Sequence, residues 1–103
     1  MRTMNNDKYL PMGTVVLLRK GSKKIMIFGR KQVKMDTGEQ FDYIAHLYPE
    51  GNIKKDMAIL FNHDDIREVV HLGYVDEDEE LFQRAFLQTG RVADVEDILH
   101  TKK

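Results

Sequence analysis

The side chains best suited to chemistry lie in one short stretch, Phe61-Asn62-His63-Asp64-Asp65-Ile66. An imidazole beside carboxylates could exchange protons with a substrate or offer ligands to a metal ion. The four polar residues stand between two apolar ones, however, which is typical of a turn that joins two strands. Asn62 suits a turn cap because its side chain accepts backbone N–H bonds, and Asp65 stands where a capping box has its acid. We therefore expect Asn62 and Asp65 to be structural, with His63 and Asp64 facing solvent.

The histidines do not predict a metal site. A zinc ion needs three or four ligands that converge on one point, and the chain has four histidines and no cysteine. The histidines follow neither HxH nor HxxxH spacing, although His46 and His71 could face each other if their strands pair. Metal binding, or a hydrolase-like activity, at Asn62 to Asp65 therefore stays a secondary alternative.

The sequence also lacks the patterns of common catalytic sites. Neither Ser22 nor any threonine stands in the strained, glycine-flanked turn that presents a nucleophile. The glycines are scattered singly along the chain, so no glycine-rich loop is formed that could cradle a phosphate group. We therefore predict no catalytic residues, no cofactor and no enzymatic activity.

The charges of the chain are unevenly distributed. Residues 1–34 carry nine basic side chains and one acidic one, whereas residues 35–103 have a net charge of −9. The basic hairpin Arg19-Lys20-Gly21-Ser22-Lys23-Lys24 could contact phosphates, so a nucleic-acid-binding small barrel is an alternative function. A sequence pI of about 6.4 and the lack of aromatic residues among these bases argue against it. The simpler expectation is that this hairpin is solvated or faces the acidic end of the chain.

Composition indicates a globular domain rather than a membrane protein. Hydrophobic residues make up 42% of the chain and charged residues 32%, which is ordinary for a folded domain. No apolar run approaches the ~20 residues that span a bilayer, and residues 1–7 lack the apolar core of a signal peptide. We expect one domain over residues 1–103, located in the cytoplasm and not inserted in a membrane.

Five β-rich runs follow one another along residues 9–75. β-branched and aromatic side chains, bounded by glycine, proline and polar turns, predict strands at 14–19, 24–30, 41–48, 57–61 and 69–74. In the third run, alternation places Tyr43 and Ala45 on one face of the strand and His46 on the other. We expect an antiparallel meander that curls into an SH3-like half-barrel, preceded by a flexible segment at residues 1–8.

After the last β-rich run, the apolar residues recur at helical spacing. Asp76 can cap a helix over 76–88, and the acids of its first turn suit the positive end of the helix dipole. Three apolar residues of this helix form a stripe that we expect to be buried against the sheet: Leu81, Phe82 and Phe86. A second short helix is expected at 92–99. Residues 76–100 then form a helical C-terminal part, and the fold class is α+β.

Six strings of the sequence stand in one order: Tyr9-Leu10-Pro11-Met12-Gly13-Thr14-Val15-Val16, Ile25-Met26-Ile27-Phe28-Gly29, Phe41-Asp42-Tyr43-Ile44, Leu47-Tyr48-Pro49-Glu50-Gly51, Phe61-Asn62-His63-Asp64-Asp65-Ile66 and Gly73-Tyr74. With them the chain resembles a small domain-of-unknown-function family of Gram-positive bacteria, often encoded beside type VII secretion genes and LXG toxins. The YPEG and FNHDDI strings in tandem are the specific part, and the resemblance runs from Tyr9 to about Phe82. The family has no established activity to carry over.

The resemblance implies a cytoplasmic accessory protein, an adaptor or chaperone that recognises the toxin's helical export domain or its helical accessory proteins. We therefore expect a non-enzymatic protein whose partner is another protein, and the charge-split surface suits oriented docking. Two chain reversals are the candidate contacts, because turns present side chains at the surface. They consist of Tyr48, Pro49, Glu50 and Gly51 in the first, and of Asn62, His63, Asp64 and Asp65 in the second.

Overall fold

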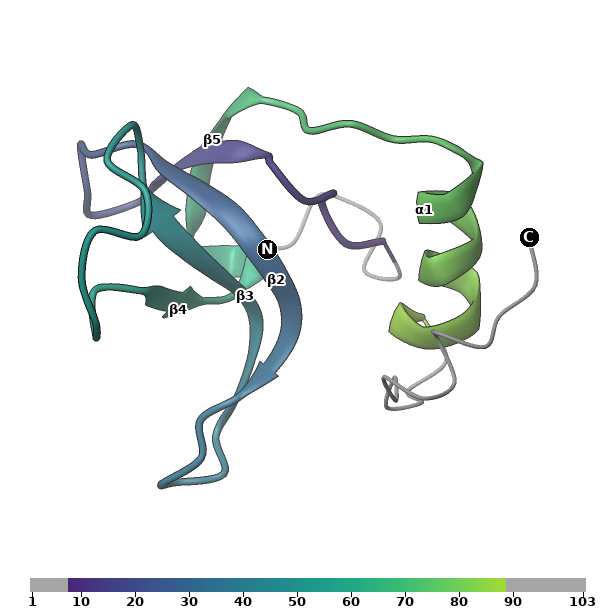
Figure 1. The fold of residues 1–103 in the computed structure, drawn as a ribbon, viewed down its shortest axis with the longest axis horizontal. Helices are drawn as coiled ribbons and strands as arrows, with labels where there is room; N and C mark the ends of the chain where they lie inside the picture. Colours follow the sequence, from purple (N-terminus) through teal and green to yellow (C-terminus); the bar gives the residue numbers. More distant parts are fainter. Residues whose placement is uncertain (1–7, 89–103) are drawn as a thin grey trace.

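The computed structural model describes residues 8–88, which form a five-stranded antiparallel sheet and one helical segment (Figure 1). The strands are β1 (Val15–Leu18), β2 (Ile25–Val33), β3 (Gln40–Leu47), β4 (Ile59–Phe61) and β5 (Ile66–His71). The 3₁₀ turn η1 (His63–Asp65) precedes β5, and the helix α1 (Glu77–Phe82) continues into the π-helical turn η2 (Gln83–Leu87). The predicted α+β class and five strands are confirmed, whereas the predicted helix at 92–99 lies outside the described residues. No helix within residues 8–88 has the length and apolar character needed to cross a bilayer.

The sheet is open and does not close into a barrel. Its strand order is β4-β3-β2-β1-β5, so the first four strands form a meander and β5 returns to pair with β1. Residues 8–88 thus contain two edge strands, β4 and β5. The β5 strand begins three residues before the predicted 69–74, because the turn in front of it occupies only the three residues of η1.

The core lies on one face of this sheet. Six buried residues form it, and they come from four strands: Val16, Ile25, Ile27, Tyr43, Ala45 and Phe61. The predicted alternation in the third strand is confirmed, since Tyr43 and Ala45 are buried two residues apart. His46 projects from the other face and stacks on the Phe28 ring with centroids 3.8 Å apart. His46 and His71 could face each other only if their strands paired, and this condition is not met, because β3 and β5 are not neighbours in the sheet.

The helical segment begins as predicted but buries different residues. Asp76 caps α1, and its carboxylate accepts the N–H of Glu79 at 3.0 Å. The expected apolar stripe is wrong in part: Leu81 is 51% exposed, and the two phenylalanines are only half-buried. Gln83 and Leu87 are buried instead. Gln83 and Leu87 stand four residues apart and follow Glu79 at the same spacing, so these three residues share one face of the helical segment, and that face is the buried one.

Polar contacts attach α1 to the sheet. The helix stands to one side of the sheet rather than across its face (Figure 1). Arg30 of β2 binds both carboxylate oxygens of Glu79, at 2.7 and 2.9 Å, and also donates to the main-chain oxygen of Leu10. The Arg30 side chain is 5% exposed and that of Glu79 is 13% exposed. A buried, bidentate ion pair therefore fixes the position of the helix.

Candidate functional site

The turn at Asn62 to Asp65 is built by its own side chains. The Asp65 carboxylate accepts the N–H of Asn62 at 2.9 Å, the well-formed half of a capping box. The Asn62 side-chain oxygen accepts the N–H of Asp42 on β3, also at 2.9 Å. This turn thereby joins the end of β4 to the start of β5 and ties both to β3. The prediction that Asn62 and Asp65 have structural roles is confirmed by these bonds.

His63 is buried, so the expectation that it faces solvent is wrong. Its main-chain N–H donates to Asp42 Oδ2 at 2.8 Å, which draws the residue inward. Its Nδ1 lies 3.0 Å from the Tyr43 hydroxyl, and that hydroxyl accepts the N–H of Leu10 at 2.8 Å. We infer that the Tyr43 hydrogen points to Nδ1. The Tyr9 ring covers the imidazole at a centroid distance of 5.1 Å.

This arrangement encloses the imidazole of His63 beside a carboxylate from another strand. His63 Nε2 lies 3.7 Å from Asp42 Oδ2, but the His63 side chain is only 2% exposed and has no open face toward a substrate. Burial also raises the pKa of the Tyr43 hydroxyl well above its usual range. Asp64, in contrast, is exposed as predicted. Within the described part of the chain, no three His, Asp or Glu side chains gather as a metal ion would require.

The Tyr43 hydroxyl provides a direct test of this network. Replacing Tyr43 with phenylalanine leaves the part-buried N–H of Leu10 without its acceptor, so the free energy of unfolding should fall by about 1–3 kcal/mol. Tyr48→Phe, at a side chain that is 41% exposed, should change it little. Urea unfolding of both variants measures the difference, and an equal, small effect at the two positions would contradict the network.

The other predicted turn, Tyr48 to Gly51, is exposed and differently built. The Tyr48–Pro49 peptide bond is cis, and the Gly51 N–H donates to Leu47 O at 2.7 Å. Gly51 has a φ of 76°, a left-handed conformation that suits glycine. Lys23 lies 2.8 Å from the Glu50 carboxylate, and this hydrogen bond lowers the pKa of Glu50.

The two turns contact different parts of the molecule. The first binds the β1–β2 connection, since Tyr48 N–H donates to Lys24 O at 2.9 Å. The second contacts Asp42 of β3 and Arg19, whose Nε donates to the main-chain oxygen of Asp64 at 2.7 Å. The structure thus does not show the eight predicted residues as one site. It also shows that the Glu50 carboxylate neutralises part of the positive charge of the basic hairpin through its ion pair with Lys23.

An apolar strip that sequence reasoning missed lies along β5 and the chain after it. Six residues of the strip have large hydrophobic side chains that are 41–80% exposed: Met12, Val69, Val70, Leu72, Tyr74 and Val75. Met12 lies next to the strip because Gly73 packs against the main chain of Met12. Gly73 also donates its N–H to Thr14 Oγ1 at 3.0 Å. The run had been predicted as a strand, but its position at the sheet edge follows only from the strand order.

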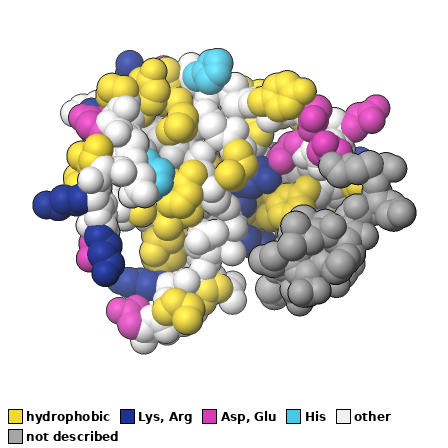
Figure 2. Space-filling view, in the orientation of Figure 1, with side chains coloured by type: hydrophobic (Ala, Val, Ile, Leu, Met, Phe, Trp, Pro, Cys, Tyr) yellow, Lys and Arg dark blue, Asp and Glu magenta, His cyan; other side chains and the backbone are white. Residues whose placement is uncertain are grey.

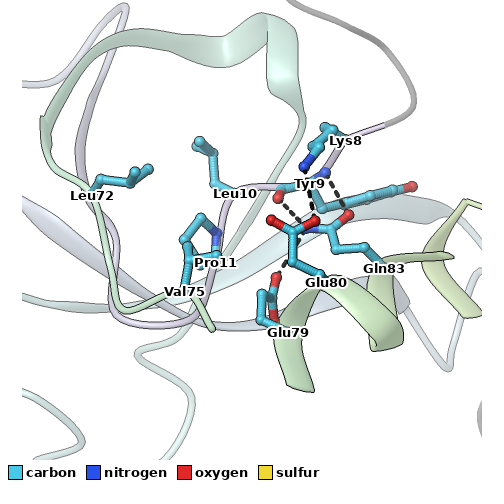
Figure 3. A pocket seen from close by; sticks show the side chains of 9 residues that line it. All are labelled: Lys8, Tyr9, Leu10, Pro11, Leu72, Val75, Glu79, Glu80 and Gln83. Atoms are coloured by element: carbon cyan, nitrogen blue, oxygen red, sulfur yellow. Dashed lines mark hydrogen bonds and ion pairs between the residues drawn. The ribbon is translucent and has the colours of Figure 1, made fainter. Parts of the chain in front are cut away.

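A pocket of about 180 Å³ lies between this strip and α1 (Figure 3). Its apolar wall comes from the segment before β1 and from the chain after β5, and its polar wall comes mainly from α1. The lining residues are Lys8, Tyr9, Leu10, Pro11, Leu72, Val75, Glu79, Glu80 and Gln83. The Gln83 side chain bridges the two walls, since it accepts the N–H of Tyr9 at 3.1 Å and donates to the Tyr9 oxygen. We define this as the β5–α1 pocket.

Comparison with known proteins identifies a family for the chain. No curated protein and no solved structure matches the chain. The sequence model of one family matches residues 9–82, which is most of the chain and includes all five strands, both turns and α1. The chain therefore belongs to the family described as Domain of unknown function (DUF4176).

Proposed function

We propose that this protein is a non-enzymatic, protein-binding accessory, an adaptor or chaperone for a type VII (LXG-type) secreted toxin in the cytoplasm. The observation that carries the protein-binding part is the apolar strip on β5. Several large apolar side chains exposed along one edge of a sheet are typical of an interaction site. The link to secretion and to the toxin's export domain, or to its helical accessory proteins, rests on the resemblance of the sequence strings.

The position of the strip at a sheet edge supports docking of another chain. β5 pairs with β1 on one side, and within residues 8–88 no strand pairs with its other side. An edge strand of this kind offers backbone N–H and C=O groups to an added strand. Five of the six β5 residues are exposed, so an added segment could contact their side chains as well.

The two turns contribute unequally to this proposal. Tyr48, Pro49 and Glu50 are exposed and can contribute to a contact surface. In the second turn, Asn62 and Asp65 serve the local structure and His63 is buried, so a partner would meet mainly the exposed Asp64.

Co-expression with the export domain of an LXG toxin tests the proposed function. We expect the two chains to elute together in size-exclusion chromatography. The double variant Val70→Ser, Leu72→Ser should lose the complex, because both side chains belong to the strip. The matched control is Val33→Ser, Met35→Ser, which changes two exposed apolar residues at the β2–β3 hairpin and should keep it. Separate elution of the wild-type chain and the export domain would count against the toxin as partner.

A gel shift tests the nucleic-acid alternative. If the basic hairpin bound phosphates, labelled DNA or RNA would shift at low salt and the shift would weaken steeply as salt is added, because counterions are released on binding. We expect no shift, since Lys23 is already engaged by Glu50.

A further inference from the structure

The β5–α1 pocket has one wall that is apolar and one that is acidic. Leu10, Pro11, Leu72 and Val75 form the apolar wall, and Figure 3 shows the two carboxylates of α1 and Gln83 of η2 on the opposite side. Acidic side chains gather over α1 on the face shown in Figure 2. A ligand that combines an apolar portion with a positive charge would complement both walls.

The acidic wall is held in place before any ligand binds. Glu79 is bound by Arg30, and the Gln83 amide donates to Glu79 Oε2 at 2.9 Å. Gln83 is in turn held by the main chain of Tyr9. These contacts leave Glu79 with little capacity for a further cation. They also fix the helix turn that carries Glu80, so that carboxylate is presented at the pocket.

Within residues 8–88, the ion-pair partner of Glu80 is Lys8, and the contact is weak. The Glu80 carboxylate lies 3.5 Å from Lys8 Nζ, and the two side chains are 45% and 51% exposed. An exposed pair at this distance contributes little stability, on the order of 0–1 kcal/mol. A second basic group could therefore replace Lys8 at small cost. In the structure, Lys8 stands where such a group would bind.

We propose that the β5–α1 pocket receives a lysine or arginine side chain from an extended segment of the partner protein, which adds to the free edge of β5. The inference rests on the proposed function and specifies the chemistry of the partner. Leu72 directly follows β5 and lines the pocket, so the inference requires the added segment to continue past the end of β5. The aliphatic stem of a basic side chain can pack on Leu72 and Val75 while its charged end meets Glu80.

Other occupants fit the two walls less well. An acidic side chain would add a third carboxylate beside Glu79 and Glu80, whose two partner cations, Arg30 and Lys8, are already engaged. A purely aliphatic side chain would fill the apolar wall but would separate Glu80 from Lys8 without supplying a replacement cation. A basic side chain satisfies both walls.

A display library of short random peptides, selected on the immobilised full chain, tests the proposal. We expect enriched peptides to contain a lysine or arginine flanked by β-branched or aliphatic residues. Failure to enrich any peptide, or enrichment of peptides without a basic residue, would overturn the inference. Neither result decides whether the toxin's export domain binds, because the co-elution experiment measures that separately.

Single substitutions then locate the basic side chain of an enriched peptide, with affinity measured by fluorescence anisotropy. Glu80→Gln should weaken binding by about two- to fivefold, and Lys8→Gln should strengthen it slightly because the internal competitor is removed. Leu72→Ser should weaken it by about tenfold or more, since the apolar wall is lost. Met35→Ser is the control, at a side chain that is 93% exposed on the β2–β3 hairpin. If Leu72→Ser lowers the affinity and Glu80→Gln does not, Glu80 does not bind a basic side chain and the inference about the charge is overturned. The apolar docking surface at Leu72 would still be supported.

Discussion

Replacing Glu79 with glutamine should lower the free energy of unfolding by about 3–5 kcal/mol, the range observed when one member of a buried ion pair is removed. The substitution leaves the Arg30 guanidinium, 5% exposed, without its counter-charge. Phe82 only partly compensates, since its ring lies 5.6 Å from the Arg30 guanidinium carbon. Urea unfolding followed by circular dichroism gives the measurement.

The neighbouring acid provides a matched control. Glu80→Gln has the same chemistry one residue later, but the Glu80 side chain is 45% exposed, so we expect a change of less than about 1 kcal/mol. Replacing both Arg30 and Glu79 with apolar residues should recover much of the loss, because no buried charge is then left uncompensated. Equal stabilities of the two glutamine variants would mean that the ion pair does not hold the helix.

Alanine at position 73 should be the other strongly destabilising substitution, with a loss of about 3 kcal/mol. A Cβ added to Gly73 would clash with the carbonyl oxygen of Met12 and lie 2.9 Å from Thr14 N. Both are main-chain atoms, so the conflict cannot be relieved by rotating a side chain. The segment after β5 or the segment before β1 would have to move, and the apolar strip would be disrupted.

The control for this position is Gly21→Ala. An added Cβ at Gly21 meets no atom within 4 Å, so the substitution should leave stability unchanged or slightly raised. Thermal unfolding compares the two variants. The affinity of an enriched peptide for Gly73→Ala, measured at a temperature where the variant is folded, shows separately whether the apolar strip still binds. A melting temperature of Gly73→Ala equal to that of the wild type would show that the two segments are not in contact.

Local signals in the sequence predicted the features that depend on neighbours in the chain. Asp76 as a helix cap follows from residue type and from the acids after it, and the same holds for the turn at Asn62 and Asp65. The alternation of β3 identified Tyr43 and Ala45 as core residues because side chains of a strand point to opposite faces. These features need no knowledge of the rest of the fold.

Other features depend on contacts between distant segments, and the sequence did not predict them. Val69 and Val70 have the residue types of a buried strand, but the strand order puts them at an edge. His63 is a polar residue in a polar turn, and only its bonds to Asp42 and Tyr43, about 20 residues away in the chain, place it inside. The buried position of Gln83 goes with its hydrogen bonds to the main chain of Tyr9, 74 residues away in the chain, which no local pattern around Gln83 indicates.

The pairing of β5 with β1 has a consequence for the order in which the chain folds. The β2–β3 hairpin joins segments that are close in sequence, whereas Leu18 pairs with Ile66 and Val15 with His71. Closing a loop of about 50 residues costs more chain entropy than closing a hairpin, so contacts of this kind form late. During synthesis, β5 emerges from the ribosome after the other four strands and completes the sheet. We expect amide hydrogens of β5 to gain protection from exchange last in refolding, so that until then β1, and not β5, is the edge strand on this side of the sheet.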